Sequence, residues 1–109
     1  MGLFGSSGEW QEAAAESEFE STDRKLLDLG GEKQIGLFKV DDGYHAISAW
    51  CSHQKTSMVH GELDGHELMC PLHGARFDVR SGKNLSLPAV KPVAHYPVKV
   101  EDGKIYVKA

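Results

Sequence analysis

The chain has 109 residues, of which 40% are hydrophobic and 26% are charged, the balance of a globular domain. This length supports one hydrophobic core and excludes a binding module joined to a separate catalytic domain. The net charge of −4, with scattered Lys and Arg, argues against nucleic acid as a partner. No apolar segment is long enough to span a membrane, so we expect a cytoplasmic protein without a membrane partner.

The N-terminal part of the chain combines a small-residue start with an acidic stretch. Residues 1–8 are predicted to form a flexible Gly/Ser leader, and Trp10 begins a candidate strand. The stretch from Glu12 to Asp23 is either one helical turn or a connecting loop, and the run Ala13 to Ala15 favours a helix. We expect the acidic face from Glu9 to Asp23 to be exposed to solvent.

Turn signals recur at short intervals through the rest of the chain. They are the dipeptides Gly30-Gly31, Asp42-Gly43, Asp64-Gly65, Ser81-Gly82 and Asp102-Gly103. Between them, β-rich sequence covers residues 34–40, 44–47 and 96–107, and its alternation predicts half-buried strands. There is no internal repeat and no sustained helical periodicity. The sequence therefore predicts one all-β domain over residues 1–109, an antiparallel sandwich or small barrel.

Two short segments each combine one cysteine with one histidine. They are Cys51-Ser52-His53 and Cys70-Pro71-Leu72-His73, with sixteen residues between His53 and Cys70. A hairpin at Asp64-Gly65 would bring the two segments side by side. One thiolate and one imidazole from each segment could then bind a single metal centre.

The chemistry of these four residues leaves several interpretations open. The two cysteines could form one disulfide, which would remove both thiolates. A tetrahedral zinc ion accepts two sulfurs and two nitrogens, but structural zinc sites usually pair cysteine with cysteine and histidine with histidine. A [2Fe-2S] cluster explains the mixed segments, because one iron can take both cysteines and the other both histidines.

The segment from Cys51 to Gly82 resembles the cluster-binding region of Rieske-type ferredoxins, the small electron carriers of bacterial ring-hydroxylating oxygenase systems. Beyond the four ligands, the resemblance rests on Pro71 and Gly74, on Phe77-Asp78 and on Ser81-Gly82. It covers roughly residues 9–109. It implies a β-sandwich base with a smaller inserted cluster-binding subdomain at about residues 49–80.

The same resemblance implies a ligand set and a role. Cys51 and Cys70 would bind one iron of the [2Fe-2S] cluster, and His53 and His73 the other iron, near the surface; Pro88 would belong to a loop that covers the cluster. The chain would be an electron carrier without enzymatic activity of its own. It would be a monomer that transiently binds an NAD(P)H-dependent flavoprotein reductase and a terminal oxygenase. Alternatives are a small subunit of an assimilatory nitrite reductase and a structural zinc-binding interaction module.

Departures from the wider Rieske family predict a low reduction potential. High-potential Rieske proteins have an extra cysteine in each ligand loop, whereas neither 54–56 nor Leu72 supplies one here. They also place hydroxyl groups at the positions of Ala75 and Phe77. Because hydroxyl donors stabilise the reduced cluster, their absence predicts a potential near the low end of the Rieske range, about −150 mV.

Other conspicuous residues receive structural roles. Gly74 is expected to let backbone N–H groups approach the cluster sulfurs. Trp10, Trp50 and Phe77 are predicted core aromatics. The four histidines outside the motif are predicted to be strand or hairpin residues and not ligands: His45, His60, His66 and His95.

Overall fold

A computed structural model describes residues 9–28, 34–50, 59–71, 74–86 and 91–109. Ten strands and one 3-10 helix are assigned in these ranges. They are β1 (Trp10–Ala15), η1 (Glu16–Glu20), β2 (Arg24–Asp28), β3 (Gln34–Val40), β4 (Gly43–Ser48), β5 (Leu63–Asp64), β6 (Glu67–Met69), β7 (Arg76–Asp78), β8 (His95–Tyr96), β9 (Val98–Glu101) and β10 (Lys104–Lys108). The predicted leader 1–8 and the dipeptide Gly30-Gly31 lie outside the described residues.

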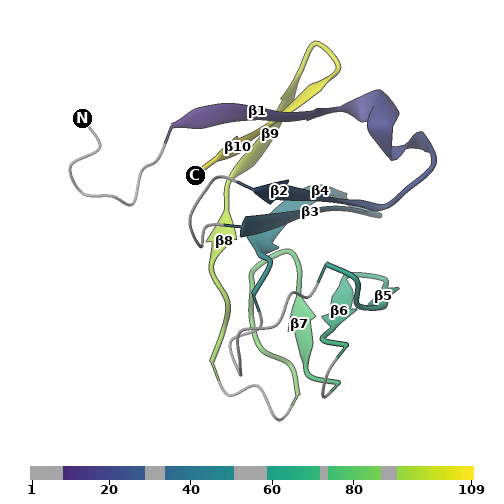
Figure 1. Ribbon diagram of the computed structural model, residues 1–109, viewed down its shortest axis with the longest axis vertical. Coiled ribbons are helices and arrows are strands. Elements are labelled where there is room, and N and C mark those ends of the chain that lie inside the picture. The colour runs from purple at the N-terminus through teal and green to yellow at the C-terminus, as the bar shows by residue number, and fades with distance from the viewer. Residues whose placement is uncertain (1–8, 29–33, 51–58, 72–73, 87–90) are drawn as a thin grey trace.

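The strands form three antiparallel sheets (Figure 1). The outer sheet has the order β1-β10-β9, the middle sheet β2-β3-β4-β8 and the small sheet β5-β6-β7. In sequence, the small sheet is inserted between β4 and β8 of the middle sheet. The prediction of an all-β fold with an antiparallel sandwich is confirmed.

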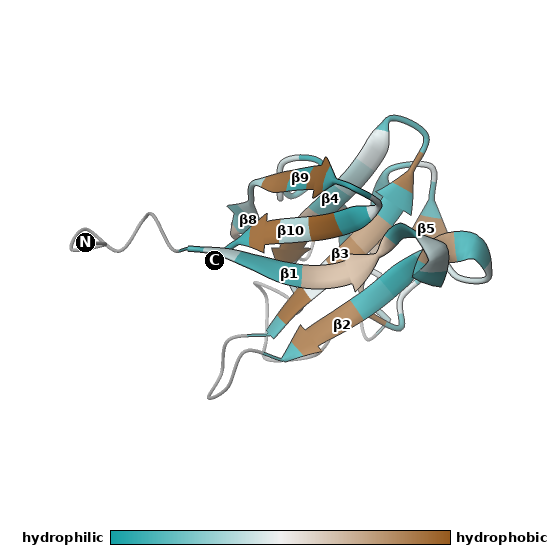
Figure 2. Ribbon diagram, turned by 90° about the horizontal axis from the view of Figure 1, so that it is seen from above, coloured by the Kyte–Doolittle hydropathy of each residue, from teal (hydrophilic) through white to brown (hydrophobic). Residues whose placement is uncertain are grey.

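The outer and middle sheets enclose one apolar core. Its buried residues come from β1, η1, β3, β4 and β10: Ala14, Phe19, Ile35, Leu37, Ala46, Ile105 and Val107. Seen from above in Figure 2, brown, apolar colouring appears on β2, β3, β9 and β10. These two packed sheets form the base of the molecule, and burial of this apolar surface is the main term that stabilises it.

The other face of the middle sheet packs on the small sheet. Phe38 and Ile47 join a second core with Leu68, Cys70, Ala75, Phe77, Val79 and Val93. Residues 35–38 of β3 are therefore buried on both faces of the sheet. For residues 35–38 the prediction of a half-buried strand is wrong, because here the strand packs between the outer and the small sheet; Lys39, further along, is exposed.

Several predicted strands and turns are confirmed. β3 covers residues 34–40 as predicted, and β4 extends the predicted 44–47 by one residue at each end. The Asp64-Gly65 dipeptide lies in the β5–β6 turn. At the β9–β10 turn, Asp102 and Gly103 have φ of 52° and 75°, the left-handed pair typical of tight hairpins.

Two predicted segments differ in the structure. Ala13 to Ala15, expected to favour helix, belong to β1 and pair with β10, and helical structure begins only at Glu16. Tyr96, expected to begin the last hairpin, pairs with Ala46 of the middle sheet instead. Pro97 follows it without an N–H to donate, and the outer-sheet strand begins at Val98.

The predicted core aromatics separate into three environments. Phe77 is fully buried, Trp50 is half-buried, and Trp10 is 39% exposed on the outer sheet. The Nζ atoms of Lys99 and Lys108 lie 4.7 and 5.8 Å from the centre of a Trp10 ring. The prediction of a core role for Trp10 is wrong, because it stands on an edge strand where lysines cover its ring.

The expectation for the acidic face is confirmed, and the expected strand and hairpin positions are confirmed for three of the four histidines, whereas His60 lies in a turn before β5 and not in the hairpin. The acidic residues between Glu9 and Asp23 are all exposed. His45 and His95 lie in strands, and His66 lies in the β5–β6 turn. Within the described ranges, no helix has the length and apolar character to cross a membrane.

Candidate metal centre

Of the four predicted ligands, Cys70 lies within the described residues. Cys51, His53 and His73 fall outside them, as do Pro88 and residues 54–56. No group of three or more potential metal ligands comes together in the part of the chain that the structure describes. The predicted ligand site can therefore be compared with the structure only around Cys70.

Cys70 follows the last residue of β6 and begins the connection to β7. Two backbone hydrogen bonds close this connection: the Cys70 N–H donates to the Ala75 carbonyl at 2.6 Å, and the Gly74 N–H donates to the Cys70 carbonyl at 3.0 Å. Gly74 has a φ of 78°, a conformation that side chains other than glycine rarely adopt. The two ends of this connection, at Cys70 and at Gly74 and Ala75, are therefore held together by backbone hydrogen bonds.

The side chain of Cys70 is a free thiol with 2% exposure. It lies in the second core among Leu68, Ala75, Phe77 and Val79. A thiol in this setting argues against the disulfide interpretation. Thiolate sulfur is a soft ligand, and this sulfur is shielded from solvent by apolar side chains, so the residue fits a ligand of an iron–sulfur centre.

The chain reaches the surface immediately after Cys70. Pro71 is exposed, whereas Cys70 and Ala75 on either side of the loop are buried. The loop therefore has an inner side, which holds the thiol, and an outer side that faces solvent at Pro71. This polarity fits a centre whose sulfur-bound side is shielded and whose other side is accessible.

Three further predictions about this loop can be compared with the structure. The N–H of Gly74 closes the loop onto the Cys70 carbonyl, so this N–H is not free to approach a sulfur. Ala75 and Phe77 are fully buried in the same core as Cys70. Neither side chain has a hydroxyl group, and the prediction of a low reduction potential rests on this absence.

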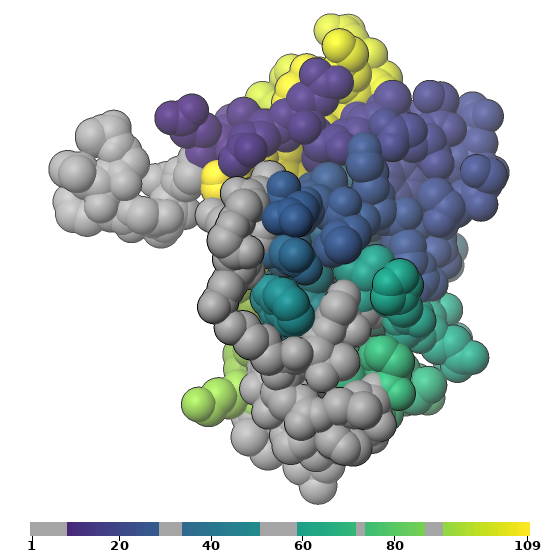
Figure 3. Space-filling view, viewed as in Figure 1, coloured from purple at the N-terminus to yellow at the C-terminus, as the bar shows by residue number. Residues whose placement is uncertain are grey.

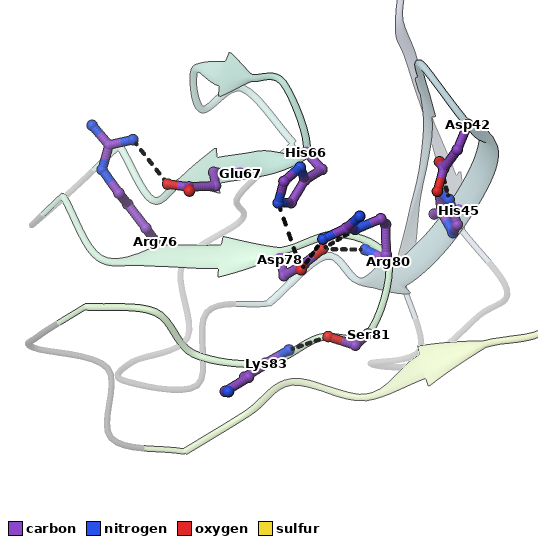
Figure 4. Close-up of polar contacts among 9 residues, drawn as sticks. All are labelled: Asp42, His45, His66, Glu67, Arg76, Asp78, Arg80, Ser81 and Lys83. Atoms are coloured by element: carbon purple, nitrogen blue, oxygen red, sulfur yellow. Dashed lines mark hydrogen bonds and ion pairs between the residues drawn. The ribbon is translucent and has the colours of Figure 1, made fainter.

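Charged side chains bind one another at the end of the small sheet that lies away from Cys70, where β7 ends at Asp78 (Figure 4). The Arg80 side chain donates to both oxygens of Asp78, at 3.1 and 3.0 Å, and the Arg80 N–H donates to Oδ1 at 2.9 Å. His66 Nε2 lies 3.8 Å from Oδ2 of the same carboxylate. Burial alone would raise the pKa of Asp78, but the hydrogen bonds and charge of Arg80 lower it below its usual value.

An open cavity with both charged and apolar surface lies between the small sheet and the β3–β4 hairpin of the middle sheet. Val40, Asp41 and Asp42 line this cavity of about 200 Å³ from one side, and Gly65, His66 and Arg80 line it from the other. His45 binds Asp42 at 2.8 Å, and this hydrogen bond is the main reason that the pKa of Asp42 is lowered. In Figure 3 the green residues of the small sheet lie directly against the blue strands of the base.

Comparisons with known proteins agree on one family. Residues 9–97 match the model of the Rieske [2Fe-2S] domain. The chain is 36% identical to a Ralstonia ferredoxin component of naphthalene 1,2-dioxygenase/salicylate 5-hydroxylase systems, over 91% of this chain and 94% of that protein.

Solved structures extend this agreement to the fold. The ferredoxin of carbazole 1,9a-dioxygenase from Nocardioides aromaticivorans IC177 is 31% identical, with a TM-score of 0.84 over 93% of this chain and 98% of that one. A ferredoxin solved in complex with the oxygenase of carbazole 1,9a-dioxygenase is 29% identical, with a TM-score of 0.85 over 91% of this chain and 92% of that one. The chain belongs to the Rieske [2Fe-2S] family and is a ferredoxin, an electron carrier with one Rieske-type cluster.

Proposed function

We propose that Cys51 and Cys70 bind one iron of the [2Fe-2S] cluster and that His53 and His73 bind the other. The segment at about residues 49–80 would then be the cluster-binding subdomain. The observation that carries the assignment is Cys70, a free thiol with 2% exposure at the start of a connection whose two ends are held together by backbone hydrogen bonds. The mixed ligand set is the one that distinguishes Rieske clusters from all-cysteine clusters.

The residues around Cys70 perform three tasks in this function. The apolar core with Leu68 and Phe77 excludes water from the thiolate side, and the Gly74 and Ala75 backbone bonds fix where the thiolate lies. The exposed Pro71 keeps the outer side of the loop open to a partner. The cluster supplies the one-electron redox chemistry, and its surroundings keep it stable and accessible.

We propose that the chain passes single electrons from an NAD(P)H-dependent flavoprotein reductase to a terminal oxygenase in the cytoplasm. The relatives are ferredoxin components of dioxygenase systems, and a structural neighbour was solved together with its oxygenase. These relatives favour this role over a subunit of nitrite reductase. Each partner would bind a monomer through a small, transient interface near the outer side of the 70–75 loop.

Metal analysis and spectroscopy of the purified chain test the cluster and its ligands. We expect two irons and two acid-labile sulfides per chain, a red-brown colour and an electron paramagnetic resonance signal after reduction by dithionite. A colourless protein with one zinc per chain would contradict the assignment.

Replacing His73 with Cys gives a sharper test, because a third thiolate makes the site more negative and should lower the reduction potential. An unchanged potential would remove His73 from the ligand set.

The partner assignment needs a separate measurement. Reduction of the chain by a flavoprotein reductase and NAD(P)H, followed by reoxidation upon addition of a ring-hydroxylating oxygenase and its substrate, is the expected sequence. Stopped-flow absorbance of the visible band follows both steps. Productive exchange with a sirohaem-containing nitrite reductase, and none with the oxygenase, would contradict the proposal.

A further inference from the structure

Arg24 connects the base of the molecule to the chain segment that lies between the two predicted ligand pairs. It is the first residue of β2 and pairs directly with Phe38 of β3, so both side chains lie on the face of the middle sheet that packs on the small sheet. The guanidinium carbon lies 5.9 Å from the centre of the Phe38 ring. The side chain is only 22% exposed.

The Arg24 guanidinium binds two backbone carbonyls outside its own sheet. Nη1 donates to the Val59 carbonyl at 2.7 Å and also to the Gly61 carbonyl. Val59 and Gly61 are both buried, and a buried carbonyl without a donor carries a free-energy penalty. Asp23 accepts from Nε at 2.8 Å and thereby fixes the orientation of the guanidinium fork.

Packing reinforces these hydrogen bonds at Val59. A Cβ atom built on Gly36 would lie 2.6 Å from Cε2 of Phe38 and 3.4 Å from Cγ2 of Val59. The absence of a side chain at Gly36 therefore makes room for the Phe38 ring. Val59 lies against this part of the sheet, while its carbonyl is held by Arg24.

Residues 59–61 lie between the two predicted ligand pairs in the sequence. In sequence they follow the segment that contains Cys51 and His53. On the other side, the carbonyl of Glu62 accepts a hydrogen bond from the Met69 N–H at 2.8 Å, and Met69 precedes Cys70. A short path of backbone and hydrogen bonds thus runs from Arg24 through Gly61 and Glu62 to the residue beside Cys70.

We propose that Arg24 is a positioning residue for the cluster: by holding the Val59 and Gly61 carbonyls to the base, it fixes the two ligand-bearing segments relative to each other. The inference rests on the proposed ligand set. Arg24 makes no contact with the metal in this proposal and acts through residues 59–62. Replacing Arg24 should therefore increase the rate of cluster loss more than it lowers the stability of the base.

Lys25 offers a matched control one residue along the same strand. Its Nζ donates to the Ala13 carbonyl at 3.0 Å and to Glu18 at 2.8 Å, so Lys25 binds one backbone carbonyl and one carboxylate, where Arg24 binds two carbonyls and one carboxylate. Both partners of Lys25 belong to the base. Arg24→Met and Lys25→Met each keep an aliphatic side chain and remove the donors, but only the first frees carbonyls beside the ligand segments.

The experiment compares wild type, R24M, R24K and K25M as purified, cluster-loaded proteins. Loss of the cluster is followed as bleaching of the visible absorbance, at the same interval below each variant's own unfolding temperature. We expect bleaching in R24M to be about tenfold faster than in wild type and K25M, since hydrogen bonds from a charged donor are lost. R24K keeps a charged donor without the planar fork and should fall between R24M and wild type.

A spectroscopic measurement separates positioning from stability alone. The g-values of the reduced R24M cluster should differ from those of wild type, whereas K25M should retain the wild-type spectrum. Equal bleaching rates and identical spectra in R24M and K25M would overturn the proposal. If R24M does not fold, R24K and K25M are compared by the same two measurements and the same criterion. A wild-type chain without iron and sulfide would instead contradict the proposed function, so the two failures are distinguishable.

Discussion

The base and the small sheet are built in different ways. In the base, strands of four to seven residues dominate and pair over continuous ladders, as in β3 with β4 from Ile35–Ser48 to Val40–Gly43. In the small sheet, β5 has two residues and β6 and β7 have three each. Strands this short gain little from their own ladders. The small sheet depends on the core it shares with the base, on turns and on individual contacts such as that of Arg24.

With the proposed ligand set, redox function belongs to the part of the molecule whose described strands are shortest. The base supplies a rigid surface, and Phe38 and Ile47 on that surface complete the core around Cys70. Ligand loops can then be shaped for the metal, because they do not have to stabilise the fold themselves.

The largest effect is expected from removing the Cys70 thiol, which lies in the core shared by the small sheet and the base. Cys70→Ser should reduce iron retention from two per chain to nearly none, because a serine hydroxyl is a poor ligand for this cluster. Amide exchange measured by mass spectrometry should still show protection of β1, β3 and β10, whose shared core does not include Cys70. Loss of protection throughout the base would show that its stability depends on the cluster.

A glycine where the two parts meet is the next test. A Cβ atom on Gly82 would lie 2.1 Å from the Val93 carbonyl oxygen, and Gly82 has a φ of 80°. Gly82→Ala should therefore cost about 3 kcal/mol of the free energy of unfolding, measured in urea. Gly65 has a φ of 62° and open space around it, so Gly65→Ala should cost only about 1 kcal/mol. Equal costs would show that the chain at Val93 can move away.

Hydroxyl substitutions in the core of the small sheet change the redox chemistry with little effect on the base. From a starting value of about −150 mV, Ala75→Ser and Phe77→Tyr should each raise the reduction potential by a fraction of the Rieske range. Protein-film voltammetry measures the midpoint. A wild-type midpoint above zero, or no rise in either variant, would contradict the account of the low potential.

The smallest effect concerns acid stability of the small sheet. Since the folded state lowers the pKa of Asp78, ionised Asp78 stabilises the fold above its ordinary pKa, and this contribution is lost as the pH falls through the lowered value. Asp78→Asn should destabilise the protein by about 1 kcal/mol at neutral pH and flatten the loss of stability in acid. Urea unfolding at a series of pH values checks this. An unchanged slope in the variant would assign the acid dependence to other carboxyl groups.

How much of the fold could be predicted from the sequence depends on how strong the local signals are. Strand β3 and the Asp64-Gly65 and Asp102-Gly103 turns carry strong local signals, and the structure confirms them. β2, with the sequence RKLLD, has neither alternation nor β-branched residues, and only its pairing with β3 makes it a strand. In β1, pairing with β10 outweighs the helix propensity of the three alanines.

For the candidate site, by contrast, the prediction depends on side-chain chemistry and not on secondary-structure signals. The Cys-His spacing and the resemblance to Rieske ferredoxins predict the ligand set without knowledge of the fold, because metal chemistry restricts which residues can serve. Arg24 could not be found in this way. Its partners are backbone carbonyls 35 and 37 residues away, which no side-chain pattern records.

Trp10 and Trp50 give the molecule two optical reporters at different places. Trp50 directly precedes the predicted ligand Cys51, whereas Trp10 lies partly exposed on the outer sheet. The middle sheet separates that outer sheet from the small sheet, as Figure 1 shows. In a Trp50→Phe variant, the emission of Trp10 would report unfolding of the base, while visible absorbance reports the cluster. The time between the two signals would show in which order the two parts of the protein come apart.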